Sequence, residues 1–133
     1  MKRIDIVVPC YNEQEVLQTF YNETSKVTST LTEYSFRFLL VDDGSRDETV
    51  LIMKRLAREH EDVKYLSFSR NFGKEAAMYA GLKHSSGDYV IIMDADLQHP
   101  PAMIPDMVAG TEEGFDCCAA RRVSREGESR LRS

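Results

Sequence analysis

Four short apolar runs, each followed by a segment with helical periodicity, constrain the fold of this 133-residue chain more than any other feature. Continuous apolar strands that alternate with helices are typical of α/β proteins, whose parallel sheets are buried on both faces. We therefore predict an α/β domain with a mostly parallel sheet sandwiched by helices. Strands are expected at residues 4–9, 36–41, 63–69 and 89–94, with a fifth at 115–120, and helices at 13–31, 46–60 and 74–84, with a fourth from Pro100 and Pro101 onward.

Local signals predict where some of these helices begin and end. Ser45 and Glu48 have the spacing of a capping box, so the second helix is expected to begin just after Ser45. Pro101 suits the first turn of the fourth helix, and Gly114 suits the position just past its end.

Polar side chains follow each of the first four predicted strands at the point where the strand ends. The carboxyl ends of parallel strands lie at one edge of a sheet, and α/β proteins bind ligands there. One binding site built from several loops is therefore expected. The polar clusters are residues 9–13, 42–47, 70–74 and 95–98.

Asp94 and Asp96 stand one residue apart where a buried strand runs out into a loop. Such carboxylates repel each other and are costly to bury, whereas a divalent cation resolves both problems. Mg²⁺ and Mn²⁺ prefer hard oxygen ligands, and Mg²⁺ is commonly held by one or two carboxylates together with substrate phosphates. The hypothesis is a metal–diphosphate site, to which Gln98 adds a neutral oxygen. Acidic pairs also occupy solvated turns, so this pair alone does not establish a metal site.

The other clusters supply groups that suit a nucleotide. Tyr11 can pack its ring on a base while its hydroxyl stays in water. Asp42 or Asp43 can accept hydrogen bonds from a base or a ribose, and Arg70 and Lys74 offer positive charge to a diphosphate. The structural alternatives are that the aspartates only shape a turn and that Lys74 is a solvated residue of a first helical turn.

Composition and charge argue against several other classes of protein. The net charge of −5 argues against a nucleic-acid binder, although residues 121–133 carry five arginines against two glutamates and suggest a local anion site. No apolar run approaches the ~20 residues of a membrane helix, and no signal peptide is recognised. The three cysteines fit neither a disulfide framework nor a Cys-x-x-Cys metal pattern, so reduced thiols in the cytoplasm are expected.

Four sequence blocks resemble, in order, those of the GT-A catalytic domain of family 2 glycosyltransferases, over residues 4 to about 130. The blocks are VPCYNE at 8–13, VDDGSRD at 41–47, SRNFGKEAA at 69–77 and MDADLQHPP at 93–101. The branch that they resemble most is dolichol-phosphate mannose synthase with the bacterial undecaprenyl (bactoprenol) phosphate glycosyltransferases. The resemblance implies a GT-A fold, with a nucleotide-sugar-binding core at 1–120 and the start of an acceptor-side region at 121–133.

The resemblance also implies roles for individual residues. Asp43, together with Asp42, would contact the base and ribose, and Asp96 would be the main metal ligand. Arginines after the fifth strand would grip the donor diphosphate or the lipid phosphate. The candidates for nucleotide binding, which include the two basic residues named above, are Pro9, Tyr11, Glu13, Asp42, Asp43, Arg70, Lys74 and Asp94. The candidates for the metal are Asp94, Asp96 and Gln98, and those for catalysis are Asp94, Asp96, Arg121, Arg122 and Arg125.

The activity that the resemblance implies is transfer of a hexose from a UDP- or GDP-sugar to a polyprenyl phosphate lipid, with inversion and with Mg²⁺ or Mn²⁺ as cofactor. The alternatives are a family 2 transferase that acts on a saccharide hydroxyl and a nucleotide-binding module without catalysis. The motifs do not distinguish the sugar or the base, and they leave a homo-oligomer open.

Members of the family are longer than this chain, and the bacterial branch usually ends in two membrane helices. The chain is therefore expected to be the truncated N-terminal part of a longer protein. That protein would act at the cytoplasmic face of a membrane, held there by its C-terminal region, whereas the fragment itself would be soluble and of uncertain activity.

Overall fold

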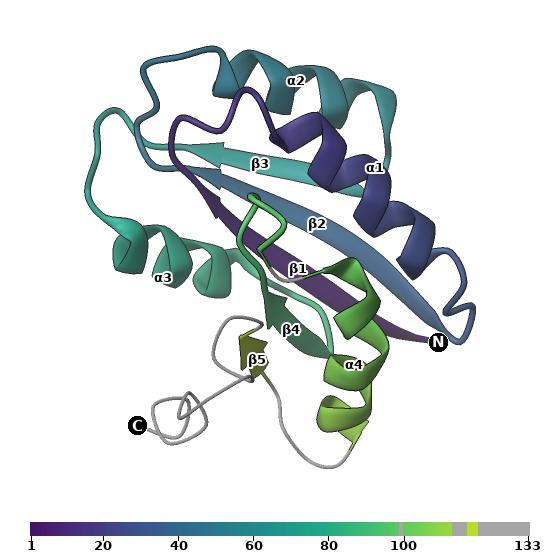
Figure 1. Ribbon diagram of the computed structural model, residues 1–133. Helices are drawn as coiled ribbons and strands as arrows, with labels where there is room; N and C mark the ends of the chain where they lie inside the picture. Colours follow the sequence, from purple (N-terminus) through teal and green to yellow (C-terminus); the bar gives the residue numbers. More distant parts are fainter. Residues whose placement is uncertain (99, 113–116, 120–133) are drawn as a thin grey trace.

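The computed structural model describes residues 1–98, 100–112 and 117–119. Its centre is a five-stranded, wholly parallel sheet with the strand order β3-β2-β1-β4-β5, flanked by helices on both faces (Figure 1). The α/β prediction is thereby confirmed. The strands are β1 Lys2–Cys10, β2 Tyr34–Asp42, β3 Val63–Ser67, β4 Tyr89–Ile92 and β5 Cys117–Ala119, and the helices are α1 Leu17–Thr28, α2 Thr49–Glu59, α3 Lys74–His84 and α4 Ile104–Glu112, the last preceded by a 3-10 turn at Pro101–Met103.

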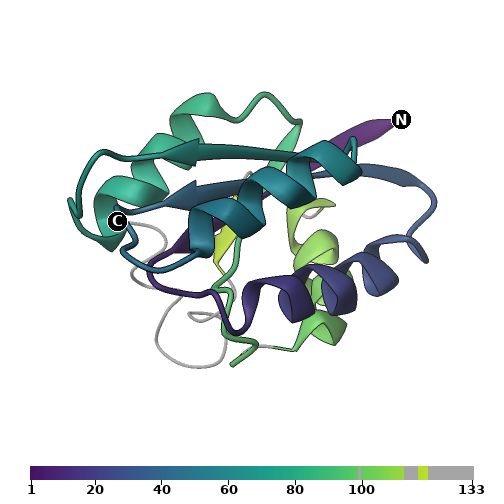
Figure 2. The ribbon, with the colours of Figure 1, turned by 90° about the horizontal axis from the view of Figure 1, so that it is seen from above.

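The helices divide unequally between the two faces of the sheet. Helices α1, α2 and α4 cover one face and α3 covers the other (Figure 2). Alternation along β1 produces this arrangement, because successive side chains of a strand point to opposite faces. Ile6 packs in the larger core with Phe20 of α1 and Met53 of α2, whereas Val7 packs in a smaller core with Ala77 of α3. Each described helix is too short or too polar to cross a lipid bilayer.

The strand order creates a crevice beside β1. The chain proceeds from β1 outward to β2 and β3, and then returns to place β4 on the other side of β1. Pairing of β1 with β2 continues to Cys10, whereas pairing of β1 with β4 stops at Val7. The last residues of β1 therefore extend beyond β4 at the carboxyl edge of the sheet, which is where open α/β sheets bind ligands.

Several predicted boundaries are corrected by the structure. Helix α2 begins at Thr49, with no side-chain cap at its start, so the capping-box prediction is wrong. The Ser45 hydroxyl instead accepts a hydrogen bond at 2.8 Å from the backbone N–H of Asn12, in another loop. Helix α1 begins at Leu17 rather than at Glu13, whose carbonyl accepts hydrogen bonds within the preceding turn.

The remaining boundary predictions are in part corrected and in part confirmed. The strands β3 and β4 end two residues earlier than predicted, at Ser67 and Ile92. Pro101 begins the 3-10 turn that leads into α4, as expected for a proline at a first helical position. A fifth strand is confirmed at Cys117–Ala119, and Gly114 lies outside the described residues.

Candidate functional site

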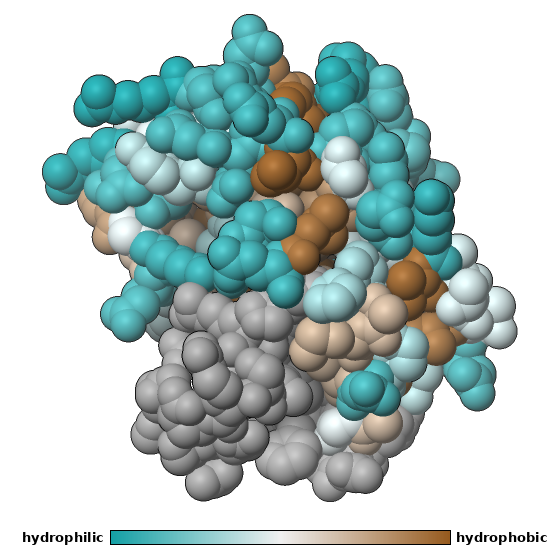
Figure 3. Space-filling view, viewed as in Figure 1, coloured by the Kyte–Doolittle hydropathy of each residue, from teal (hydrophilic) through white to brown (hydrophobic). Residues whose placement is uncertain are grey.

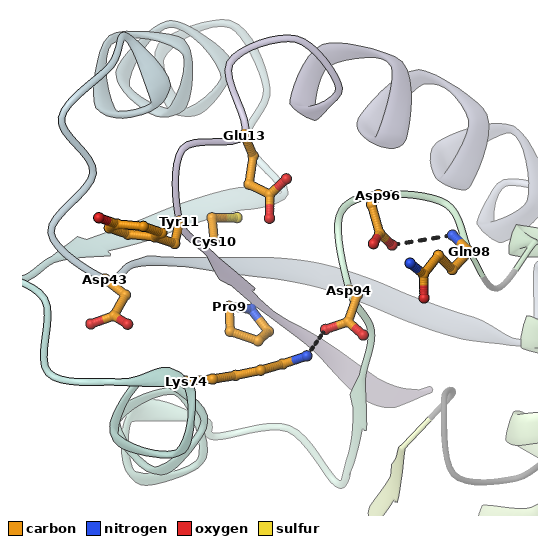
Figure 4. Close-up of a pocket in the computed structure, with 9 residues that line it drawn as sticks. All are labelled: Pro9, Cys10, Tyr11, Glu13, Asp43, Lys74, Asp94, Asp96 and Gln98. Atoms are coloured by element: carbon orange, nitrogen blue, oxygen red, sulfur yellow. Dashed lines mark hydrogen bonds and ion pairs between the residues drawn. The ribbon is translucent and has the colours of Figure 1, made fainter.

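A cavity of about 300 Å³ opens at the carboxyl edge of the sheet, at the crevice between β1 and β4 (Figure 4). Its residues come from the end of β1, from the loops after β1, β2 and β4, and from the start of α3. Over the loops at this edge, at the upper left of Figure 3, the surface is mostly hydrophilic. The cavity is lined by Pro9, Cys10, Tyr11, Glu13, Asp43, Lys74, Asp94, Asp96 and Gln98.

The loop after β1 is fastened to the loop before α2 by hydrogen bonds. The N–H of Glu13 donates to the Thr49 hydroxyl at 2.8 Å, and the side chain of Asn12 accepts from the N–H of Arg46 at 2.9 Å. Asn12 has a φ of 53°, a left-handed conformation that asparagine tolerates better than most residues. These bonds hold Tyr11 and Glu13 at the rim of the cavity.

The two aspartates at the end of β2 have different roles. Asp42 is buried, and its carboxylate accepts hydrogen bonds from the N–H of Ser45 and from the Ser67 hydroxyl, both at 3.1 Å. It is not among the described residues that line the cavity. Its placement therefore fits the turn-shaping alternative better than the nucleotide contact predicted for it.

Asp43 lines the cavity and also fixes the loop before α3. Its carboxylate accepts the N–H of Phe72 at 2.8 Å, the N–H of Gly73 at 3.0 Å and the side-chain amide of Asn71 at 3.0 Å. These bonds set the direction in which α3 starts, and thereby the position of Lys74, its first residue.

A close approach between two loops requires Gly44. Its φ is 73°, and a Cβ at this position would lie 2.2 Å from the backbone carbonyl carbon of Arg70. Only glycine fits so tightly in a left-handed conformation. The loop after β2 is therefore packed directly against the loop after β3.

Arg70 is not brought into the cavity. Its guanidinium lies over the ring of Phe72, 4.5 Å from the ring centroid, in a cation–π contact on the surface. Among the nine described lining residues, Lys74 carries the sole positive charge. Its Nζ lies 2.5 Å from Oδ1 of Asp94 (Figure 4).

Negative charge dominates the cavity. Four carboxylates and one ammonium line it, a balance of minus three when all are ionised. Burial raises the pKa of Glu13 above its usual range, and the negative charges of Asp96 and Asp94 raise it further. The free cavity therefore disfavours the ionised form of Glu13.

The loop after β4 presents the two predicted metal ligands that follow Asp94. Oδ1 of Asp96 accepts the backbone N–H of Gln98 at 3.2 Å, across Leu97, which has a φ of 60°. This tight turn places both polar side chains at the same side of the cavity (Figure 4).

The donor set fits Mg²⁺ or Mn²⁺, because it combines carboxylates with an amide oxygen and carries excess negative charge. Within the described residues, no three acidic, histidine or cysteine side chains converge closely enough to hold a metal by themselves. Asp94, Asp96 and Gln98 would thus hold a cation together with oxygens of a bound substrate, which is how Mg²⁺ is commonly bound.

One lining residue was missed by the sequence analysis. Cys10 is buried at the cavity wall, its thiol donates to the carbonyl of Val8, and burial raises the pKa of that thiol. Its position between two predicted lining residues was the available signal. His99 and three predicted catalytic residues lie outside the described residues, namely Arg121, Arg122 and Arg125.

Comparisons with known proteins show what the sequence and the fold of this chain are similar to. A bactoprenol glucosyl transferase of Shigella phage SfV is 42% identical over 98% of the chain. The structure of Staphylococcus aureus TarS 1–349 with UDP is 26% identical over 85% of the chain, with a TM-score of 0.67. The mannosyltransferase PcManGT of Pyrobaculum calidifontis, in complex with GDP-Man and Mn²⁺, is 27% identical over 71% of the chain, with a TM-score of 0.63.

The chain spans only part of each of these proteins. It covers 42% of the phage transferase, 32% of the TarS chain and 28% of the PcManGT chain. The glycosyl transferase family 2 model matches residues 5–133, nearly the whole length. The chain therefore belongs to glycosyl transferase family 2.

Proposed function

We propose that this chain is the donor-binding part of a glycosyltransferase that moves a hexose from a UDP- or GDP-sugar to a polyprenyl phosphate, with inversion and with a divalent cation. The observation that carries this proposal is the composition of the cavity at the crevice between β1 and β4. It combines an aromatic ring, four carboxylates and a single lysine.

The charge balance supports the use of a cation. A nucleoside diphosphate is itself strongly anionic, and a cavity with three excess negative charges repels it. A divalent cation held by Asp94, Asp96 and Gln98 would reduce this repulsion by bringing positive charge to the cavity. The structure of the similar protein PcManGT contains GDP-Man and Mn²⁺, which supports the use of a divalent cation.

The other end of the cavity suits the nucleoside. Tyr11 is 42% exposed and offers its ring to a base, while Asp43 lines the same space. Figure 4 shows these two side chains on the side of the cavity opposite Asp96 and Gln98. A nucleotide sugar would therefore lie with its base near Tyr11 and its diphosphate near Asp94.

The acceptor is assigned from chemistry and from the relatives. A phosphate oxygen of the lipid attacks the anomeric carbon, and the bond from that carbon to the diphosphate breaks, leaving its electron pair on the nucleotide. A cation held by Asp94, Asp96 and Gln98 would stabilise this leaving charge. A lipid phosphate is already anionic at neutral pH, so the reaction needs no strong general base. The phage relative's name, bactoprenol glucosyl transferase, supports a lipid acceptor and a membrane-associated whole protein.

The test is calorimetric binding of UDP and of GDP in the presence of Mn²⁺. Asp96→Asn keeps the shape and the turn to Gln98 but removes the charge, so we expect at least about a hundredfold loss of affinity, because a cation contributes several kcal/mol to such a site. Asp106→Asn, an exposed aspartate in the first turn of α4, is the matched control and should bind like the wild type. Equal affinity of all three proteins would remove Asp96 as the metal ligand.

A further inference from the structure

Lys74 and Asp94, which both line the cavity, form an ion pair with each other. Its Nζ–Oδ1 distance is 2.5 Å, and the side chains are 40% and 17% exposed. Figure 4 shows the lysine stem extended along the cavity, from the side of Asp43 to Asp94.

This pair has two competitors. Oδ1 of Asp94, which the lysine contacts, is an oxygen that a divalent cation would use. The ammonium of Lys74 is the sole cation among the nine described lining residues, and a diphosphate would attract it. A cation on Asp94 would repel the nearby ammonium, and a diphosphate would attract that ammonium away from Asp94, so each incoming ligand weakens the present pair.

We propose that Lys74 is an internal counter-ion that is exchanged when the donor binds, passing from Asp94 to the diphosphate as Asp94 passes to the cation. This inference rests on the proposed function and adds to it a coupling between the binding of the cation and the binding of the nucleotide. The flexible four-carbon stem of a lysine permits the movement without a change in the backbone.

The exchange makes the two ligands cooperative. The cation alone must displace Lys74 from Asp94, and the nucleotide alone must draw Lys74 away and leave Asp94 without a counter-charge. When both bind, each provides the charge that the other removed. Such coupling is reciprocal: the nucleotide raises the affinity for the cation by the same factor as the cation raises the affinity for the nucleotide.

The test measures Mn²⁺ binding to the whole chain by calorimetry without nucleotide, and again with saturating UDP or GDP, whichever the wild type binds. Lys74→Met removes the competitor, so we expect it to bind Mn²⁺ alone about fivefold or more tightly than the wild type, the lower end of typical coupling factors. It should also bind the nucleotide more weakly in EDTA. Lys83→Met, an exposed lysine in the last turn of the same helix, is the matched control and should match the wild type in every measurement.

The outcomes separate the two proposals. A Lys74→Met protein that binds Mn²⁺ alone no tighter than the wild type overturns the exchange and leaves the proposed function standing. A wild type that binds neither UDP nor GDP with Mn²⁺ overturns both. If circular dichroism shows that the methionine variant is unfolded, Lys74→Gln replaces it with the same expectations. The nucleotide chelates Mn²⁺ in solution equally for each protein, so the ratio between variants isolates the effect of Lys74.

Discussion

Two aspartates at opposite ends of α3 each contact a basic side chain, but their surroundings differ in kind. Asp5, within β1, is fully buried. Its Oδ2 accepts hydrogen bonds from the Ser85 hydroxyl at 2.7 Å and from the N–H of Gly87 at 2.9 Å, and Arg37 lies 3.2 Å away. Asp94, in the cavity, forms an ion pair with Lys74, its one such partner among the residues that the structure describes.

The protonation equilibria of the two regions differ in the same way. Burial opposes ionisation of Asp5, but hydrogen bonds from Ser85, Ser86 and Gly87 and the charge of Arg37 outweigh it, so its pKa lies below the usual range. In the cavity, burial and neighbouring carboxylates raise the pKa of Glu13. The partners of Asp5 thus more than compensate for its burial, whereas burial and acidic neighbours outweigh the partners of Glu13.

Helix α3 connects the two regions. Its first residue is Lys74, in the cavity, and Ser85, just after its last residue, donates to Asp5. The Asp5 contacts therefore anchor the C-terminal end of α3, while its N-terminal end presents Lys74. The comparison predicts that changes near Asp5 affect stability and that changes in the cavity affect binding.

The largest expected effect is on stability, from Asp5→Ala. This variant leaves Arg37 partly buried without its partner and frees the hydrogen-bond donors of residues 85–87, so the free energy of unfolding should fall by about 3 kcal/mol. Urea denaturation measures the change. Asp106→Ala, an exposed aspartate, should change it by no more than about 0.5 kcal/mol.

The same prediction has a pH dependence. Because the folded pKa of Asp5 is lowered below its usual value of 3.8, its contribution to stability is fully present above that pH and is lost as the pH falls through the folded pKa. The difference between wild type and Asp5→Ala should therefore shrink on acidification below pH 3.8. A loss below about 1 kcal/mol at neutral pH would remove the contrast between the two regions.

The second effect is on binding, from Tyr11→Ala. If the exposed ring stacks on the base, affinity for UDP or GDP with Mn²⁺ should fall by about 1–3 kcal/mol, while the free energy of unfolding changes little. Tyr11→Phe keeps the ring and should bind like the wild type. Tyr79→Ala, at an α3 tyrosine that is 67% exposed, is the control for loss of a surface tyrosine. Equal nucleotide affinity in Tyr11→Ala would assign the ring to packing.

The cavity was more predictable from the sequence than the Asp5 contacts. Apolar runs give the strands, and parallel strands bring their carboxyl ends to one edge, so the polar residues that follow the strands had to converge. Tyr11, Asp43 and Lys74 were predicted on this basis and do line one cavity. Asp5 was passed over inside an apolar run, because its partners Arg37 and Ser85 are 32 and 80 residues away in sequence.

Local patterns failed where a distant group competed for the same side chain. Ser45 has the spacing of a helix cap, but the N–H of Asn12, 33 residues away in sequence, donates to its hydroxyl instead. Arg70 and Lys74 are equally basic in the sequence, and the ring of Phe72 holds the first of them outside the cavity. Asp42 and Asp43 are adjacent, and only their partners show which one faces the ligand space.

The smallest expected effect is on the free energy of unfolding, from Glu13→Gln in the cavity. The folded pKa of Glu13 is raised above its usual value of 4.5, so the folded protein loses stability as the pH rises from that value through the folded pKa. Removing the charge should therefore raise the free energy of unfolding at neutral pH, by about 0.5 kcal/mol for a side chain that is not fully buried. The difference from the wild type should vanish below pH 4.5. At neutral pH its sign is opposite to that of Asp5→Ala, because Glu13→Gln stabilises the fold and Asp5→Ala destabilises it. Urea denaturation at both pH values measures it, with Glu59→Gln, at the exposed end of α2, as the control. A Glu13→Gln protein less stable than the wild type at neutral pH would mean that partners within the fold already compensate the charge of Glu13, as they do for Asp5.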